Sequence, residues 1–171
     1  MNGKTNLKQF QQGLAERLSS GERNGASDSL LCVEAGGERW LLNLFDAGEV
    51  LPLPPLADVP LTQPWYAGLA NVRGTLYSVV DLAAFHGLPP APRGSEARLL
   101  LAGARHDINS ALLVDRILGL RAPEGLRAEP APADTDRPWA GERLRDDRGD
   151  LWRRLKVREL LEAPRFLDVA L

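Results

Sequence analysis

Three side chains near the middle of the chain have the chemical types that acyl-transfer enzymes use. Ser78 could act as a nucleophile, His86 as a general base and Asp81 as the carboxylate that orients the histidine. All three fall within nine residues, on a predicted strand and the short helix after it, and no nucleophile-elbow sequence accompanies them. A small hydrolase using Ser78 is therefore a distant alternative, and no catalytic residue is expected.

Arg73 poses a different problem, because it interrupts an otherwise apolar, strand-like run. It lies within Trp65–Gly87, between two segments whose composition is typical of buried strands. A guanidinium keeps its charge inside a protein, and a buried charge without a partner is costly. The sequence therefore predicts either a carboxylate beside Arg73 or a surface at which Arg73 faces a partner.

Composition argues against several other classes of function. The net charge is −2, so no overall basic field indicates nucleic acid or an acidic lipid surface. The two histidines and one cysteine lack metal-ligand spacing, and no Gly-rich phosphate loop is present. Cys32 lies in a predicted buried strand, where a structural role is expected. No run approaches the roughly 18 apolar residues of a membrane span. A cytosolic protein without a metal or cofactor is expected.

The elements that position these residues are short apolar runs separated by turn signals. An amphipathic helix is predicted over residues 5–18, because Leu7, Phe10, Leu14 and Leu18 recur at helical spacing. Short helices are also predicted before Gly87 and at Arg158–Ala163, and Ala122–Asp136 is predicted to be a loop. Strands are predicted at Leu30–Glu34, Arg39–Leu44, Val50–Leu53, both sides of a turn at Asn71–Gly74, Arg98–Ala102, Ser110–Leu118 and Leu151–Val157. This pattern predicts a mainly β barrel or sandwich.

One set of motifs resembles a known family. Gly68, then Asn71-Val72-Arg73-Gly74, then Val79-Val80-Asp81-Leu82 are similar to the central signature of CheW-like coupling proteins. The resemblance implies two intertwined, five-stranded SH3-like β-barrel subdomains with a hydrophobic groove between them. It divides the chain into an N-terminal helix and linker (1–28), a CheW-like domain (29–162) and a C-terminal tail (163–171).

The resemblance also implies a function. CheW-like proteins are non-enzymatic adaptors that join the cytoplasmic tip of a chemoreceptor to the regulatory domain of a CheA-type histidine kinase, in membrane-associated and mostly polar receptor arrays. The N-terminal helix, Trp65-Tyr66-x-Gly68 and Trp152-x-x-Leu155 resemble the PilI branch, which serves twitching motility of the type IV pilus. A coupling protein of flagellar chemotaxis is the alternative. Neither nucleic acid nor direct membrane insertion is expected.

Site residues follow from the same resemblance. Glu49 occupies the position of the family's Val-x-Glu-Ile motif, and its spacing of 24 residues to Arg73 matches the family's acid–arginine pair. We expect a charge-assisted, bidentate pair, which either sets the wall of the receptor groove or only shapes a turn. Asp81 is expected to cap the helix that follows it, and Asp115 to give structural support. The residues expected at the receptor groove are Glu49, Val50, Gly68, Asn71, Arg73 and Gly74.

Two further features concern charge. Residues 137–158 contain eight basic and four acidic residues, a local charge of +4, for which a solvated face or a protein contact is favoured over nucleic acid or anionic lipid. Lys156 departs from the family, whose closing strand usually reads Leu-Asp-Leu. His86 lies at a predicted helix end, where a cation suits the helix dipole.

Overall fold

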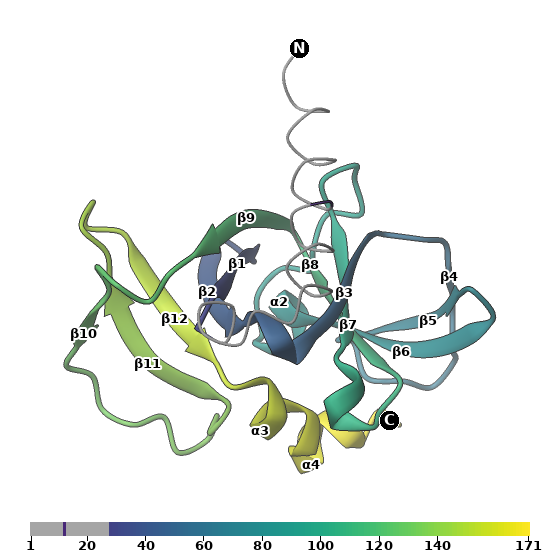
Figure 1. Ribbon diagram of the computed structural model, residues 1–171. Helices are drawn as coiled ribbons and strands as arrows, with labels where there is room; N and C mark the ends of the chain where they lie inside the picture. The colour runs from purple at the N-terminus through teal and green to yellow at the C-terminus, as the bar shows by residue number, and fades with distance from the viewer. Residues whose placement is uncertain (1–11, 13–27) are drawn as a thin grey trace.

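The computed structural model describes Gln12 and residues 28–171. Two six-stranded sheets lie side by side, and the chain passes from the first sheet into the second and then returns (Figure 1). The helix predicted over residues 5–18 lies outside the described residues, apart from Gln12, which is helical and exposed.

The first sheet combines strands from the beginning and the end of the described chain. Its order is β10-β11-β12-β2-β1-β9, and neighbouring strands are antiparallel except for the parallel pair β12 and β2. The predicted hairpin at its start is confirmed, with a turn at Gly36-Gly37. The strands are β1 (Leu30–Ala35), β2 (Glu38–Asn43), β9 (Arg116–Arg121), β10 (Arg127–Glu129), β11 (Ala140–Arg145) and β12 (Leu151–Leu155).

The second sheet is built from the central part of the chain. Its order is β3-β7-β8-β6-β5-β4, with a single parallel pair, β6 and β8, among its named neighbours. The strands are β3 (Ala47–Pro52), β4 (Leu56–Ala57), β5 (Tyr66–Val72), β6 (Thr75–Asp81), β7 (Arg98–Ala102) and β8 (Ser110–Val114). Proline lacks a backbone donor, and accordingly the Pro-rich stretch between β3 and β5 holds only the two-residue β4.

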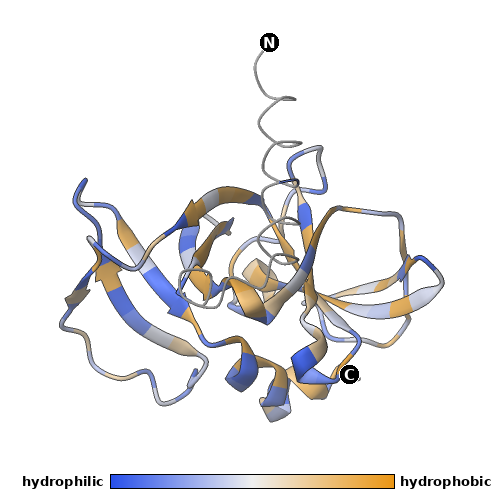
Figure 2. Cartoon of the chain, in the orientation of Figure 1, coloured by the Kyte–Doolittle hydropathy of each residue, from blue (hydrophilic) through white to orange (hydrophobic). Residues whose placement is uncertain are grey.

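Short helices connect the strands and close the chain. The α-helices are α2 (Leu82–Phe85), α3 (Val157–Glu162) and α4 (Pro164–Leu167), and 3-10 turns cover Leu44–Asp46 and Ala104–His106. Pro164 starts α4 rather than only ending α3, because its fixed φ suits the first helical position. Both terminal helices mix hydrophobic and hydrophilic residues (Figure 2).

The main hydrophobic core lies between the two sheets. One cluster of buried residues includes members of both sheets, among them Leu31, Trp40, Val80 and Leu112, together with Phe166 of α4. Each sheet also encloses a smaller cluster of its own. Cys32 belongs to the cluster of the first sheet, as predicted, and burial raises the pKa of its thiol to about 11. The sheets are therefore held together by a shared core, which fixes the surfaces of one relative to the other.

The predicted mainly β class is confirmed, with differences in detail. Each sheet has six strands where the resemblance implied five, and each order ends in two edge strands, so closure into barrels stays a prediction. The single strand predicted over Ser110–Leu118 is wrong, because the chain changes sheets at Asp115, between β8 and β9. The loop predicted at Ala122–Asp136 is wrong at Arg127–Glu129, which pairs with β11 as an edge strand.

Candidate functional site

Arg73 lies at the tip of the β5–β6 hairpin rather than inside a strand. Val72 and Thr75 are paired across the two strands, which leaves Arg73 and Gly74 as the turn. Both turn residues have positive φ, 51° for Arg73 and 87° for Gly74, as a two-residue hairpin turn of type I′ requires. The Asn71 Oδ1 atom accepts the Gly74 N–H at 2.9 Å. The turn predicted at Asn71–Gly74 is therefore confirmed, and its geometry points the arginine outward.

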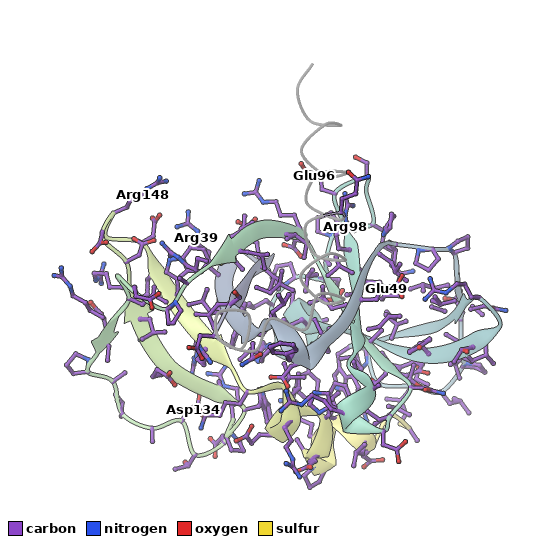
Figure 3. All side chains as sticks on the ribbon, viewed as in Figure 1. Arg39, Glu49, Glu96, Arg98, Asp134 and Arg148 are labelled. Carbon is purple, nitrogen blue, oxygen red and sulfur yellow. The ribbon has the colours of Figure 1, made fainter. Side chains whose placement is uncertain are left out.

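Glu49 of β3 meets Arg73 in a bidentate ion pair. The Nη1 atom of Arg73 donates to Glu49 Oε1 at 3.0 Å, and Nη2 donates to Oε2 at 2.5 Å. The predicted bidentate pair is confirmed, and it lies at the surface of the second sheet. The side chain of Arg73 is 69% exposed and that of Glu49 is 38% exposed. Glu49 is labelled on the side of the second sheet in Figure 3.

The pair keeps both of its charges at neutral pH. The hydrogen bond from Arg73 lowers the pKa of the Glu49 carboxyl, and the same bond raises the pKa of Arg73. Exposed ion pairs contribute little to folding, because water screens their attraction. The pair thus presents a fixed, charged feature to the solvent, at small benefit to stability.

A cavity of about 500 Å³ adjoins Glu49. Its lining includes Tyr77 of β6, and Ile108 and Asn109 of the β7–β8 connection. Sequence reasoning missed these residues, because the pairing of β3, β6, β7 and β8 brings them beside Glu49 from distant positions. The hydrophobic groove that the resemblance implied between the subdomains stays a prediction.

Two residues expected at the groove have internal roles in the structure. Val50 is buried in the main core. Gly68 has φ of 123°, and a Cβ atom there would lie 2.4 Å from the carbonyl oxygen of Ala57, so this glycine lets β4 approach β5. Gly74, by contrast, has open space around it and serves the turn. A contact of any of these residues with a receptor stays a prediction.

The two supporting aspartates hold segments of backbone. Asp81 is 5% exposed and caps α2 as predicted, because its Oδ1 atom accepts the Ala84 N–H at 3.0 Å, and its Oδ2 atom accepts the Ala91 N–H at 2.8 Å. Asp115 Oδ2 accepts the Gly36 N–H at 3.0 Å at the point where the chain changes sheets. Desolvation raises the pKa of Asp115, and its Oδ1 atom is buried without a hydrogen-bond partner.

The three residues considered for acyl transfer are engaged elsewhere. Ser78 Oγ accepts the hydroxyl of Tyr66 at 3.2 Å, while Asp81 caps the backbone. His86 Nδ1 lies 2.7 Å from the carbonyl oxygen of Leu82, and Nε2 lies 3.0 Å from Trp139 Nε1, which can only donate. Within the described chain, no hydrogen bond joins two of the three. The Ser78 hydrolase alternative therefore gains no support from the geometry.

His86 also differs from its prediction as a cation at a helix end. Burial, with a smaller contribution from nearby arginines, lowers the pKa of its imidazole to about 4. The two contacts define the neutral tautomer with the proton on Nδ1, which donates to Leu82 while Nε2 accepts from Trp139. The ring also lies 4.7 Å from Trp40 of the first sheet. His86 is therefore a neutral link between the sheets.

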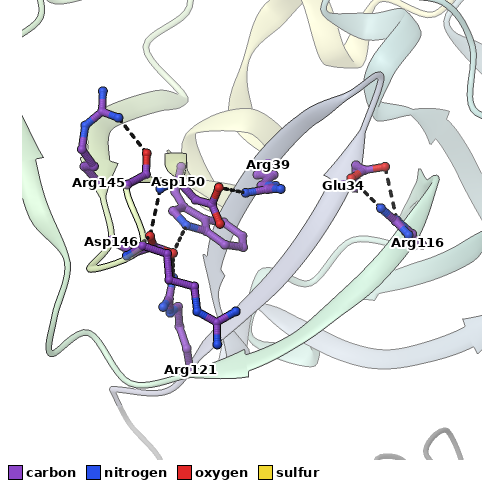
Figure 4. Close-up of polar contacts among 10 residues, drawn as sticks. Glu34, Arg39, Arg116, Arg121, Arg145, Asp146 and Asp150 are labelled. Atoms are coloured by element: carbon purple, nitrogen blue, oxygen red, sulfur yellow. Dashed lines mark hydrogen bonds and ion pairs between the residues drawn. The ribbon is translucent and has the colours of Figure 1, made fainter.

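Four of the eight basic residues in the segment 137–158 form ion pairs with carboxylates of the described chain. Arg137 and Arg153 both contact Asp134, and Arg145 pairs with Glu129 of β10. Asp146 makes the most contacts, accepting Trp152 Nε1, Arg121 Nη1 and two backbone N–H groups (Figure 4). The hydrogen bond from Trp152 lowers the pKa of Asp146. Arg145 and Asp146 therefore link the β11–β12 hairpin to Glu129 of β10 and Arg121 of β9.

Among the described residues, no cluster of three His, Cys, Asp or Glu side chains could hold a metal ion. No helix in that part of the chain is long and apolar enough to cross a membrane. The second sheet presents a bidentate ion pair beside a cavity.

Comparison with known proteins identifies the family of this scaffold. The family model described as the CheW-like domain matches residues 29–165, and the chain therefore belongs to the CheW-like domain family.

Two curated relatives agree with this assignment, and one solved structure shares the fold. The chain is 33% identical to the protein PilI of Pseudomonas aeruginosa over 108 residues, which cover 63% of this chain and 60% of PilI. It is 25% identical to a probable chemotaxis protein CheW of Rhizobium etli over 126 residues, 72% of this chain and 77% of that protein. The crystal structure of the scaffolding protein TtCheW from Thermoanaerobacter tengcongensis matches with a TM-score of 0.66 and 19% identity, over 81% of this chain and 94% of that one.

Proposed function

We propose that this protein is a non-enzymatic coupling protein that joins a methyl-accepting chemoreceptor to a CheA-type histidine kinase, in a chemosensory array that controls twitching motility of the type IV pilus. The observation that carries the proposal is the 33% identity to PilI within a chain of the CheW-like domain family. The motifs at Trp65–Gly68 and Trp152–Leu155, which resemble the same branch, add support. The match spans 60% of PilI, so the role of the whole relative enters as part of the proposal.

The Glu49–Arg73 pair is proposed as the centre of the receptor contact. Its two charged groups are held in a fixed geometry by two hydrogen bonds, and both remain accessible to solvent. Such a pair can offer charged groups to a partner with little loss of side-chain freedom on binding. In this proposal Asn71 and Gly74 contribute by setting the turn that presents Arg73.

The proposed adaptor carries out no reaction and works by binding two partners. It acts in the cytoplasm at membrane-associated, polar receptor arrays, where it contacts the receptor tip and the regulatory domain of the kinase. Binding of one partner would bias binding of the other through a coupling free energy. A core shared by both sheets supports this role, because it holds surfaces on the two sheets in a fixed relation.

A coupling protein for flagellar chemotaxis is the second candidate. It is supported by the 25% identity to the probable chemotaxis protein CheW, which covers a larger share of both chains than the match to PilI. The two candidates have the same biochemical activity and differ in the receptor and kinase that they join.

Deletion of the gene distinguishes the candidates when surface twitching and swimming are scored in the same strains. We expect twitching to be lost, swimming to be retained, and twitching to return when the gene is supplied on a plasmid. Loss of swimming with normal twitching would favour the flagellar candidate. Normal behaviour in both assays, in an organism that uses both kinds of motility, would contradict the proposed function.

A further inference from the structure

A second cavity lies on the first sheet and shares no lining residue with the cavity beside Glu49. It has a volume of about 830 Å³ and is bounded by the β10–β11 connection and by residues of β11 and β12. Pockets that bind ligands commonly have volumes of about 300–1,000 Å³. Figure 3 labels Asp134, which lies in the connection that forms one wall.

Arg153 of β12 is a mostly buried charged group of this cavity whose hydrogen bonds are only partly made. Its side chain is only 15% exposed, and its Nε atom is buried without a hydrogen-bond partner. Its Nη2 atom reaches Asp134 Oδ2 at 3.4 Å, whereas Arg137 Nε holds the same oxygen at 2.8 Å. Because Asp134 is shared and closer to Arg137, Arg153 retains capacity for another carboxylate.

Two further cations line the same cavity. Arg143 of β11 and Lys156, just after β12, are both exposed, and no ion pair within the described chain includes either one. These two residues thus add positive charge to the lining that includes Arg153.

The carboxylates of the cavity restrict what it can accept. Glu129 and Asp134 are already paired with Arg145 and Arg137. Asp136 and Glu142 are exposed in the same lining, and they would repel a dense polyanion such as nucleic acid. The remaining walls are apolar or small, including Pro132, Pro138 and Ala140. This mixture suits isolated carboxylates carried on a chain with apolar side chains.

We propose that this cavity is a docking site for an acidic segment of a partner protein, with Arg153 as its central contact and Arg143 and Lys156 as flanking contacts. The site lies on the first sheet, whereas the Glu49–Arg73 pair lies on the second. The inference does not rest on the proposed coupling function. Binding there supplies Arg153 with the carboxylate that Asp134 only partly provides.

The position of Arg153 also gives the site a spectroscopic signal. Its guanidinium lies over the ring of Trp40 at 5.8 Å, and Trp40 lies against His86 at the end of α2. A carboxylate that draws Arg153 toward the cavity changes the charge next to this indole. We therefore expect the intrinsic fluorescence of Trp40 to change on binding, and this component to disappear in Trp40→Phe.

The test titrates the isotope-labelled full chain with a short peptide that carries two glutamates among alanines and leucines, and with the same peptide carrying glutamines. We expect saturable amide shifts at Gly141–Arg143 and Arg153–Lys156 with the glutamate peptide alone. Lys156→Glu and Arg143→Glu are each expected to raise the dissociation constant about tenfold, because each reverses one charge at the site. Arg158→Glu is the matched control, since Arg158 is exposed and pairs with Glu162 outside the cavity, and it should change the constant less than about twofold.

Several outcomes would overturn the inference. Equal binding of the glutamine peptide would show that the carboxylates are not recognised. If Arg158→Glu raised the dissociation constant as much as Lys156→Glu, the attraction would be a general effect of charge. If the amide shifts were confined to the β5–β6 hairpin, the peptide would bind there and not in this cavity. Displacement of the peptide by inorganic phosphate at constant ionic strength would indicate a simple anion site. Because Lys156 and Arg143 are exposed, their variants test the site even if Arg153→Gln fails to fold.

Discussion

Arg73 and His86 flank one short stretch of chain, β6 followed by α2, and the protein treats their charges in opposite ways. At the hairpin tip, Arg73 is exposed, and its hydrogen bond to Glu49 raises its pKa. At the end of α2, His86 is packed among aromatic rings, and burial lowers its pKa to about 4. One end of the stretch keeps a charge in solvent, and the other end excludes a charge from the core.

The difference separates two ways in which a polar residue can matter. A contact in solvent contributes little to folding, so its removal should mainly affect partners that meet that surface. A neutral, hydrogen-bonded ring between two sheets contributes to folding, because its removal leaves a donor without a partner. Substitutions at the two ends should therefore affect different properties, binding at Arg73 and folding at His86.

Replacement of His86 is expected to have the largest effect on stability. His86→Ala removes the acceptor of Trp139 Nε1 and the ring that packs against Trp40. An unpaired buried donor and a lost aromatic contact together predict a loss of about 2–4 kcal/mol in the free energy of unfolding. Urea denaturation measures this loss. The exposed control Arg158→Ala should lose less than about 0.5 kcal/mol, and a similar small loss in His86→Ala would refute the buried role.

Acid should destabilise the protein through the same residue. The pKa of His86 falls from its ordinary 6.5 to about 4 in the folded protein, so the unfolded chain binds a proton more readily. The stability contributed by neutral His86 is present above about pH 6.5 and is lost as the pH falls toward 4, up to about 3 kcal/mol. We expect the unfolding free energy of the wild type to fall more steeply than that of His86→Gln across this range. Parallel pH profiles would show that His86 does not titrate there.

Asp81 lies between the two ends and should have an intermediate effect. Asp81→Ala leaves the N–H groups of Ala84 and Ala91 without their acceptor, for an expected loss of about 1–3 kcal/mol. Hydrogen exchange at these two amides should accelerate together. The exposed Asp58 offers a matched control, because Asp58→Ala should leave both exchange rates unchanged. Unchanged exchange in Asp81→Ala would contradict the capping role.

Local sequence signals predicted the elements around the exposed end. The turn at Asn71–Gly74 follows from an asparagine and a glycine between strand-like runs, and the cap at Asp81 follows from an aspartate before a short helix. The partner of Arg73 required the family's motif at Glu49, because nothing local indicates a contact across 24 residues. The apolar runs on both sides of Arg73 are the two strands of a hairpin, so the arginine lies in the exposed turn between them.

The buried end could not be predicted in the same way. The neutral state of His86 depends on Trp139 and Trp40, which lie far from it in sequence and belong to the other half of the molecule. The change of sheets at Asp115 leaves no local signal, because the apolar pattern continues through it. Arg153 is one arginine among several in a basic segment, and only the pairing of Asp134 with Arg137 leaves it partly unsatisfied.

The central claim is that the exposed pair serves binding and contributes little to folding. Arg73→Ala and the conservative Arg73→Lys test it through two measurements on each variant: the unfolding midpoint, and the dissociation constants for a receptor tip and a kinase regulatory domain. We expect the thermal unfolding midpoint of Arg73→Ala to move by less than about 2 °C. The dissociation constant for the receptor tip should rise about tenfold in the same variant. Both values for Arg73→Lys should lie between those of Arg73→Ala and the wild type. Wild-type affinity for both partners in a folded Arg73→Ala protein would contradict the account.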